Sequence, residues 1–395
     1  MLRRFRPGWA AAVALALFAA SAPAQPDDLA KALATLKGVT KEGAANDAAG
    51  PAWKTVVDAG PAAFFPALTA VDDANPTAAN WLRTAAGAVA EKEKKAGKAL
   101  DAKALEGFVT DTKHAPSARR LAYEVLVAQD AAAPQRLLPK LLDDPQPDLR
   151  REAIAHGVKL AGLAASGSGE AEKAAYRRLF GFTREKEQAE ELAKALDALG
   201  VKANVTEHFA FLTHVRVVGP FFSEKGKALS LAYPPETTPA AAEYDGKDGK
   251  VTWQAQATAD KFGKIDFNET VGRLKNACVY ARATVHADKA TPAEFRVGSP
   301  NAVAIYLNGK KLFGREEYHH GDAMDYHVGK GVLAAGENTV VVKVCQNNQT
   351  DSWAQRWQFQ ARVCDATGGP LPGLTQVVDG RKLPLGAITQ PEGKK

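Results

Sequence analysis

The sequence has few cysteines, little excess charge and no long hydrophobic run beyond its first residues. Its three cysteines stand far apart in 395 residues, so no two have the close spacing of a zinc-binding cage. The net charge is only +6, with 51 basic and 45 acidic residues, which is too little for the clustered basic surface of a nucleic-acid-binding protein. We therefore expect no nucleic-acid partner, no membrane span and no cofactor.

The first 24 residues have the pattern of a secretory signal peptide. Three arginines precede an apolar run from Trp9 to Ala20, and Ala22-Pro23-Ala24 supplies small residues for cleavage. The run is too short to cross a bilayer. We expect an exported, soluble protein, periplasmic or extracellular, whose mature chain begins near Gln25. Without the three arginines its formal charge falls from +6 to +3.

The N-terminal half has the pattern of stacked helices. From Asp27 to about Leu199 the apolar residues recur at helical spacing. Similar helix starts occur at Pro76, Pro116 and Pro147, separated by 40 and 31 residues, and periods of this order are typical of paired helical repeats.

One segment of this half carries a family signature. "LLDDPQPDLRREAIAHGVKL" resembles the HEAT repeat through the turn Asp144-Pro145, the pair Leu149-Arg150 and then Ala153. The resemblance implies an N-terminal α-solenoid of HEAT-like repeats over residues 25–165. A further helix pair, at about 169–180 and 183–199, is expected to cap the stack or link it onward within residues 166–204.

After Gly200 the period changes from helical to alternating. Short runs rich in Val, Thr, Phe, Tyr and Trp follow one another between turn residues, which predicts an antiparallel β-sandwich or jelly roll. Asn308-Gly309 is a strong signal for a two-residue hairpin turn. Such a turn would place Ile305 opposite Leu312, with both on the buried face. We expect the domain boundary between about Gly200 and His208.

The β half resembles the galactose-binding-domain-like jelly roll of secreted bacterial proteins. The resemblance covers about residues 208–368, within a domain that we place at 205–368, and rests on "VVGPFF", "AVAIYLNGKKL", "VLAAGENTVVVKV" and "WQFQARVCD". It implies a fold that serves sugar binding, protein contacts or structural attachment alike. Residues 369–395 form a tail rich in Pro and Gly, expected to be largely irregular except for a docked piece at 374–378.

In an exported protein the three cysteines could form one disulfide bond, and the third cysteine would then remain a free thiol. The last two predicted strands carry Cys345 and Cys364. In a hairpin centred near Asp351, Cys345 faces a residue near 357, so Cys364 is not its direct partner. Cys278, at the start of "ACVYARATV", is left as a partner for either cysteine.

The stretch "GREEYHHGDAMDYH", from Gly314 to His327, raises the question of a metal site. A set of His320, Asp322 and His327 has suitable ligand types, but nothing in the spacing enforces it and no HExxH pattern occurs. Adjacent residues of an extended segment point to opposite sides, so one metal ion cannot easily take both His319 and His320. We interpret the stretch as a polar loop at the ligand-facing end of the sandwich.

A second loop, "QNNQTDSWAQRW", has the chemistry of a sugar-binding site. A flat indole packs on a pyranose ring while amides bond its hydroxyl groups. The alternative is that the tryptophan covers the end of the core. Together the two loops supply our candidate ligand-binding residues: Trp353, Asn347, Asn348, Asp351, Tyr318, His319 and His320.

These patterns favour a non-catalytic exported protein, with helical repeats for protein contacts and a jelly roll for a carbohydrate or another extracellular partner. We identify no catalytic residues, because the sequence has no GxSxG elbow, no glycine-rich phosphate loop and no evidence of opposed carboxylates. One alternative is an enzyme accessory or metal-dependent hydrolytic module that uses the histidine-rich loop 315–327. Another is a purely structural assembly protein.

Overall fold

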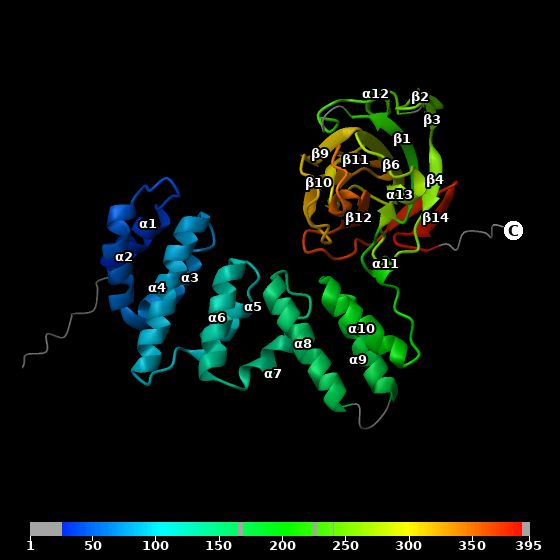
Figure 1. Cartoon of the computed structure of the whole chain (residues 1–395). Helices are drawn as coiled ribbons and strands as arrows, with labels where there is room; N and C mark the ends of the chain where they lie inside the picture. Colours follow the sequence, from blue (N-terminus) through cyan, green and yellow to red (C-terminus); the bar gives the residue numbers. More distant parts are fainter. Residues whose placement is uncertain (1–25, 165–168, 224–226, 240, 389–395) are drawn as a thin grey trace, which may run out of the picture. The chain divides into compact units, whose positions relative to one another are not determined.

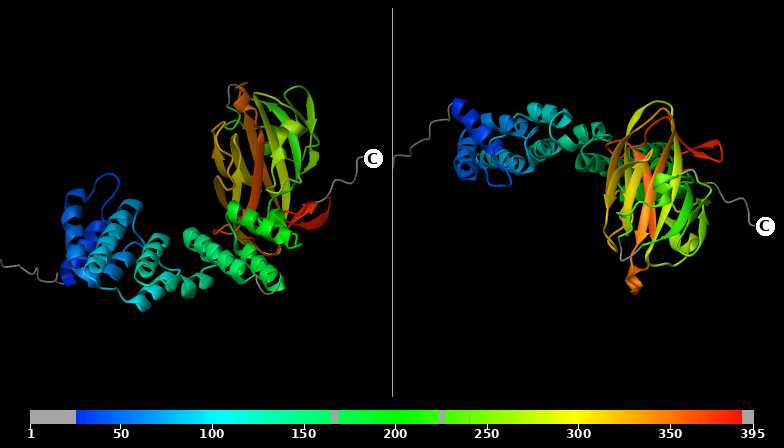
Figure 2. Two further views of the ribbon diagram at one scale, coloured as in Figure 1. Left: turned by 60° about the horizontal axis from the view of Figure 1, so that its bottom comes forward. Right: turned by 90° about the horizontal axis from the view of Figure 1, so that it is seen from above.

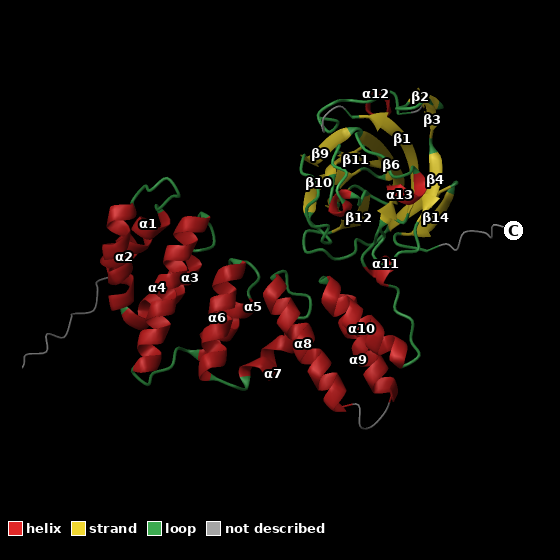
Figure 3. Cartoon of the chain, in the orientation of Figure 1, coloured by secondary structure: helices red, strands yellow, loops and turns green. Residues whose placement is uncertain are grey.

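The computed structural model describes residues 26–164, 169–223, 227–239 and 241–388 (Figure 1). The predicted signal peptide lies outside the described residues. Helices occupy the N-terminal half and antiparallel sheets the C-terminal half, as the colouring of Figure 3 makes plain. This order confirms the predicted change of period after Gly200. Within the described residues no helix is both long and apolar enough to cross a membrane.

Prolines mark the starts of several helices, as the sequence pattern predicts. Three long helices begin at Pro76, Pro116 and Pro147, and the side chain of Asn75 caps the first of them by accepting from the backbone N–H groups of Thr77 and Ala78. The helices and helical turns of this half are α1 (Pro26–Lys37), α2 (Asn46–Asp58), η1 (Gly60–Ala63), α3 (Phe64–Thr69), α4 (Pro76–Lys95), α5 (Ala102–Thr110), α6 (Pro116–Gln129), α7 (Ala133–Leu137), η2 (Leu138–Lys140), α8 (Pro147–Ala164), α9 (Gly169–Phe182) and α10 (Lys186–Ala198).

Contacts divide the chain into two compact units between Leu137 and Leu138. The first holds α1 to α7, and the second holds α8 to α10 together with the whole β half. In the second unit Phe180 of α9 and Ala189 of α10 pack in one apolar cluster with Phe209 and Phe211. The packing of these helices on the β half explains why the contact division falls before the boundary that we expected at 200–208.

The β half contains two main sheets, seen from further sides in Figure 2. The larger has the order β14-β13-β6-β11-β8-β9, with β1 paired to β6 and β4 paired to β1; the smaller has the order β10-β7-β12-β5. A separate hairpin joins β2 and β3. The strands and short helices are β1 (His214–Phe222), β2 (Glu243–Asp245), β3 (Lys250–Thr252), β4 (Gln254–Ala257), β5 (Ile265–Asp266), β6 (Ala277–Ala287), β7 (Thr291–Gly298), β8 (Ala302–Leu307), β9 (Lys310–Arg315), β10 (His327–Leu333), β11 (Gly336–Gln346), β12 (Gln358–Cys364), β13 (Leu374–Val378), β14 (Arg381–Pro384), α11 (Val205–His208), α12 (Pro234–Thr237), α13 (Phe267–Thr270) and η4 (Ser352–Ala354).

One buried hydrophobic cluster draws side chains from both sheets. Val279 and Val342 come from the larger sheet, Phe295 and Phe359 from the smaller, and Trp357 lies among them without exposure. Alternate residues of β6 and β11 face this cluster, because successive side chains of a strand point to opposite faces. The other face of the larger sheet is called the outer face below.

Two strand predictions need correction. A bulge between Ile305 and Tyr306 shifts the register, so that Ile305 pairs with Phe313 rather than Leu312. The bulge lets Leu312 and Phe313 both pack against the core. The last two predicted strands also do not form one hairpin, because β11 belongs to the larger sheet and β12 to the smaller.

Two further elements lie where we expected loop or tail. Strand β10 begins at His327, which we placed in a polar loop, and pairs along its whole length with β7. The docked piece at 374–378 is strand β13, which pairs with both β6 and β14. The segment 374–384 is therefore more ordered than a largely irregular tail, because it adds two strands to the larger sheet.

The three cysteines are buried free thiols. Cys278 and Cys345 are direct cross-strand neighbours on the outer face of the larger sheet. Cys364 pairs in register with Glu294 in the smaller sheet, away from them. Of the pairings that the sequence left open, only that of Cys278 with Cys345 brings two cysteines into register.

Candidate functional site

The two polar loops singled out in the sequence meet in the structure. His319, from the loop after β9, donates from Nε2 to the side-chain amide oxygen Oδ1 of Asn347, from the loop after β11, at 2.7 Å. Asn347 is anchored in turn, because its backbone carbonyl accepts from the N–H of Asn276 at 2.9 Å. Residues that are distant in the sequence therefore form one surface, which we call the loop site: Tyr318, His319, Asn347, Asn348, Asp351 and Trp353.

Trp353 is the most prominent side chain of the loop site. It belongs to the short helical turn η4, and 59% of its surface is exposed. The His319 ring stands nearly perpendicular to the indole, at 86°, with ring centroids 5.3 Å apart. Trp357 is fully buried by contrast, so the two tryptophans of this segment have different surroundings.

The backbone of His319 is held in an unusual conformation. Its φ is +59°, a region that non-glycine residues seldom adopt, and its N–H donates to the carbonyl of Pro300 at 2.6 Å. This conformation directs the imidazole toward Trp353 and Asn347. Strain of this kind is often found where a side chain must be held in place.

The remaining residues of the loop site surround this pair. Asn347 also donates to Gln349 at 2.9 Å, and Asn348 and Asp351 are exposed. Tyr318 is half-buried against the apolar cluster of the outer face, and burial raises the pKa of its phenol, so the hydroxyl stays protonated. The surface thus combines one exposed indole with amide, carboxylate and imidazole groups.

His320 does not join the loop site. Its ring stacks on Tyr326 with centroids 4.9 Å apart, and its Nδ1 lies 2.7 Å from the carbonyl of Gly321. His327 packs on Tyr326 and Phe313 at 4.8 Å from each. The two adjacent histidines, His319 and His320, therefore belong to different clusters, although the left-handed φ of His319 shows that the segment is not an extended strand.

Asp322 is separated from His320 and His327 by its own partners. Arg356 donates to Asp322 at 2.9 Å, and Gln358 donates to it at 2.6 Å. Burial alone would raise the pKa of Asp322, but Lys264 and Arg356 outweigh it and hold that pKa below its ordinary value. Across the described ranges no group of three His, Cys, Asp or Glu side chains is arranged to hold a metal ion. The structure does not bring the suggested metal set together.

The residues that connect the two loops through hydrogen bonds were not predicted from the sequence. Arg356 and Gln358 reach from the start of β12 to Asp322, and Gln360 donates to the Asp322 carbonyl at 3.2 Å. A signal was present, because a polar residue recurs at every second position of "RWQFQAR", between the core residues Trp357 and Phe359. That pattern shows which side chains point away from the hydrophobic core, but it does not show which residues they bind.

A second polar cluster, also missed, lies on the outer face of the larger sheet. The carboxylate of Glu236, on α12, accepts from Lys343 at 2.7 Å, from Tyr306 at 3.0 Å and from Tyr280. Lys343 has no exposure and also donates to the carbonyl of Leu231. Burial alone would raise the pKa of Glu236, but the hydrogen bonds from Lys343 and Tyr280 hold it below its ordinary value. Glu236 and Lys343 together attach the α12 segment to the sheet.

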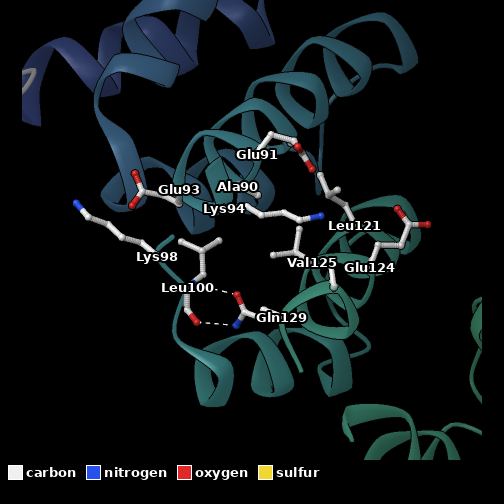
Figure 4. Close-up of a pocket in the computed structure, with 12 residues that line it drawn as sticks. Ala90, Glu91, Glu93, Lys94, Lys98, Leu100, Leu121, Glu124, Val125 and Gln129 are labelled. Atoms are coloured by element: carbon white, nitrogen blue, oxygen red, sulfur yellow. Dashed lines mark hydrogen bonds between the residues drawn. The ribbon is translucent and has the colours of Figure 1, made fainter. Parts of the chain in front are cut away.

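The helical part contains a groove between α4 and α6, of about 280 Å³ (Figure 4). Its apolar surface includes Leu100, Leu121 and Val125. The Gln129 amide closes one end by bonding both backbone groups of Leu100, at 3.1 and 2.7 Å. The buried face of α6 carries Ala118, Ala122 and Leu126, whereas Leu121 and Val125 line the groove.

The comparisons with known proteins identify no family for this chain. No family profile matches the sequence, and no curated protein matches it. Among solved structures, a β-glucosidase from Kluyveromyces marxianus in complex with glucose is similar at 12% identity and a TM-score of 0.23, over 38% of this chain and 16% of that one. A family 35 carbohydrate binding module from an environmental isolate is similar at 14% identity and a TM-score of 0.18, over 26% of this chain and 72% of that one.

A third similar structure is an anti-sigma factor domain-containing protein from Clostridium clariflavum. Its identity to this chain is 10% and its TM-score 0.22, over 46% of this chain and 49% of that one. All three TM-scores are low, and this chain spans about a sixth of the β-glucosidase.

Proposed function

We propose that this protein is an exported, non-catalytic carbohydrate-binding protein. In this proposal the β half is a galactose-binding-like sandwich that presents the loop site, and the helical half is a HEAT-like solenoid for protein contacts. The observation that carries the sugar-binding role is the exposed indole of Trp353 beside His319 and Asn347. An aromatic face with amide and imidazole groups at its edge matches the apolar faces and hydroxyl groups of a pyranose.

The loop site is built to hold its shape. His319 is fixed through its backbone to Pro300 and through its ring to Asn347, and Asn347 is fixed to Asn276. A ligand that binds a preformed surface does not have to order it first, which favours affinity. These fixed polar side chains therefore support a role in ligand recognition rather than a role as a cover over the end of the hydrophobic core.

The repeat assignment is supported by two buried arginines at the same offset from a helix-starting proline. Arg119 follows Pro116 by three positions and donates from Nε to the Val109 carbonyl at 2.8 Å. Arg150 follows Pro147 by three positions and donates to the Asp144 carbonyl at 2.7 Å. Both side chains are almost fully buried and bond a carbonyl that precedes their own helix, as expected of related structural repeats.

The groove between α4 and α6 is the surface of the helical half that we assign to protein contacts. Its apolar side chains lie between charged residues, which include Glu91, Lys94 and Glu124. An apolar centre with a polar rim is the usual anatomy of a protein interface. The double variant Leu121→Glu with Val125→Glu should abolish the cross-linking of a partner protein in the native host. The substitution Lys103→Glu, at an exposed position, should leave that cross-linking unchanged.

The sugar-binding role is tested by screening the full chain against an array of neutral glycans and against insoluble neutral polysaccharides. The proposal expects retention on at least one carbohydrate, with loss of retention for Trp353→Ala. If no glycan or polysaccharide retains the wild type, the assembly role should replace sugar binding. If stoichiometric zinc is present as purified and is lost in the double variant His320→Ala and His327→Ala, the metal-dependent alternative should replace it.

A further inference from the structure

The larger sheet carries a groove that the loop site does not use. Strand β6 pairs with β1 from Ala277 up to Arg282, where Arg216 is the partner of Arg282, and with β13 from Thr284 to Ala287, where Val377 is the partner of Thr284. The strands β1 and β13 therefore separate along one edge of β6. The space between the β1–β4 and β13–β14 pairs is a groove of about 880 Å³ on the outer face, within the range of small-ligand sites.

The groove is lined by charged, hydroxyl-bearing and small aliphatic side chains, together with the imidazole of His214. Its charged and hydroxyl-bearing side chains are Arg216, Arg282, Arg381, Thr284, Thr339 and the two carboxylates Glu337 and Asp379. No Trp, Tyr or Phe occurs among the described residues that line it. Without an aromatic platform, a neutral sugar would lack its main apolar contact, whereas three guanidinium groups suit a ligand with negative charges.

The arginines differ in how firmly they are held. Arg282 lies over the ring of Trp253, 4.3 Å from its centroid, and donates to the Pro239 carbonyl at 3.0 Å. Arg216 approaches Asp379 only at 3.9 Å, and both side chains are exposed. An exposed ion pair of that length contributes little, so a ligand carboxylate can replace Asp379 at small cost. Arg216 also donates to the Trp253 carbonyl at 3.3 Å. Arg282 is the more buried cation of the groove, and Arg216 and Arg381 are exposed.

The arrangement of the strands favours a glycan over an extended peptide. A peptide that adds to a sheet needs a free strand edge for main-chain hydrogen bonds. Along this groove Arg216 of β1 pairs with β4 on one side and β6 on the other, whereas His214 and Val215 pair with β4 alone. Strand β13 is paired with β14 and with β6. The edge of β1 left without a partner strand at the groove is thus two residues long, which is too short for a peptide to add as a strand, while side chains remain free to bind sugar substituents.

We propose that this groove is a second binding site, which takes an acidic oligosaccharide and is independent of the loop site. The guanidinium groups of Arg216, Arg282 and Arg381 bind the carboxylate or sulfate substituents, and the hydroxyl groups of Thr284 and Thr339 bond the sugar hydroxyls. A carboxylate presents two acceptor oxygens in a plane, and a sulfate presents three in a tripod. A guanidinium group can bind either of them through two N–H donors.

The test is a calorimetric titration of the full chain with four probes: oligogalacturonate, a sulfated dextran oligosaccharide, neutral dextran of equal length, and polyglutamate. The variant is Arg216→Gln with Arg381→Gln, two exposed positions whose change should leave the fold intact. Arg273→Gln is the matched control, an exposed arginine outside the groove. Trp353→Ala reports separately on the loop site.

The inference expects the wild type to bind at least one of the two acidic glycans, more weakly as salt rises, and not to bind dextran through the groove. The double arginine variant should lose roughly tenfold or more in affinity, while Arg273→Gln and Trp353→Ala stay within about twofold of the wild type. Comparing the affinities for oligogalacturonate and for sulfated dextran shows whether the groove prefers carboxylate or sulfate substituents. Absence of binding to both, equal affinity in the double arginine variant, or equal affinity for polyglutamate would overturn the inference, whatever happens at the loop site.

Discussion

The imidazole of His319 stands perpendicular to the indole of Trp353, with ring centroids 5.3 Å apart, and thereby joins two loops that are more than twenty residues apart in the sequence. Neither loop needs this contact to satisfy a backbone group. The pair is therefore better explained as part of a presented surface than as part of the core, and the following predictions separate these roles.

The two tryptophans of the β11–β12 connection should respond differently to truncation. Trp353→Ala should change the free energy of unfolding by no more than about 0.5 kcal/mol, because the side chain is largely exposed. Trp357→Ala should cost about 3–5 kcal/mol, because it removes a fully buried ring from the core. Urea denaturation followed by circular dichroism measures both. Similar losses in the two variants would place Trp353 in the core.

Glu236 and Lys343 should form a strongly coupled pair. Lys343 is fully buried, so Glu236→Ala leaves its ammonium group without a carboxylate partner. This should lower the free energy of unfolding by about 3–5 kcal/mol. The double variant Glu236→Gln with Lys343→Met should lose clearly less than the sum of the two single variants. Additive losses in denaturant titrations would show that the two side chains act independently.

The same pair should make stability fall in acid. The folded-state pKa of Glu236 lies below its ordinary value of 4.5. The group therefore stabilises the fold fully above that ordinary value, and the contribution is lost as the pH falls through the lowered folded-state pKa. In Glu236→Gln this part of the pH dependence should be absent, while the rest, from groups such as Asp325, should remain. Parallel melting profiles of the two proteins from pH 7 to pH 3 would contradict this role.

Leu149→Asp should destabilise the helical region around α8. Leu149 stands at the aliphatic position of the repeat signature and has no exposure, so an unpaired carboxylate there should cost several kcal/mol. Leu163→Asp is the matched control on the same helix, because 70% of Leu163 is exposed. Differential scanning calorimetry should show a lowered transition for Leu149→Asp alone. An unchanged transition would show that the repeat signature does not mark a buried position.

The three thiols should be unreactive in the folded protein and should all react after unfolding without reductant. Each is buried and free, and burial raises the pKa of the Cys345 thiol, which lowers its thiolate fraction further. Titration with a thiol reagent before and after guanidinium addition counts them. A single reactive thiol after unfolding would instead indicate a disulfide between the cross-strand neighbours Cys278 and Cys345.

The parts of the fold that sequence reasoning predicted are those set by local chemistry. The helix starts at Pro76, Pro116 and Pro147 were predictable because proline suits the first turn of a helix. Strand β6 was predictable because its aliphatic and polar residues alternate. Strand β10 was missed because Gly329 and Gly331 lack strand propensity. A side chain at Gly329 would meet Leu312, so the glycine is explained by close packing that the sequence does not reveal.

The candidate site was predicted in its residues but not in its connections. The exposed Trp353 and the amides near it could be recognised from composition, whereas the partners of Asp322 could not, because Arg356 and Gln358 reach it from more than thirty residues away. The pairing of Glu236 with Lys343 spans 107 residues and depends on where α12 crosses the sheet. Contacts of that range follow from strand order, which the hydrophobic pattern alone does not specify.

The most direct test of the central claim is a titration of the full chain with the neutral sugar that the glycan screen identifies, repeated on Trp353→Ala. Phe222→Ala is the control, because Phe222 is a similarly exposed aromatic residue of β1, at 53%. The account predicts that Trp353→Ala weakens binding by roughly tenfold or more, in line with the loss of a stacked aromatic contact, with an unchanged melting temperature, while Phe222→Ala binds as the wild type does. Equal affinity in Trp353→Ala and the wild type would contradict sugar binding at the loop site.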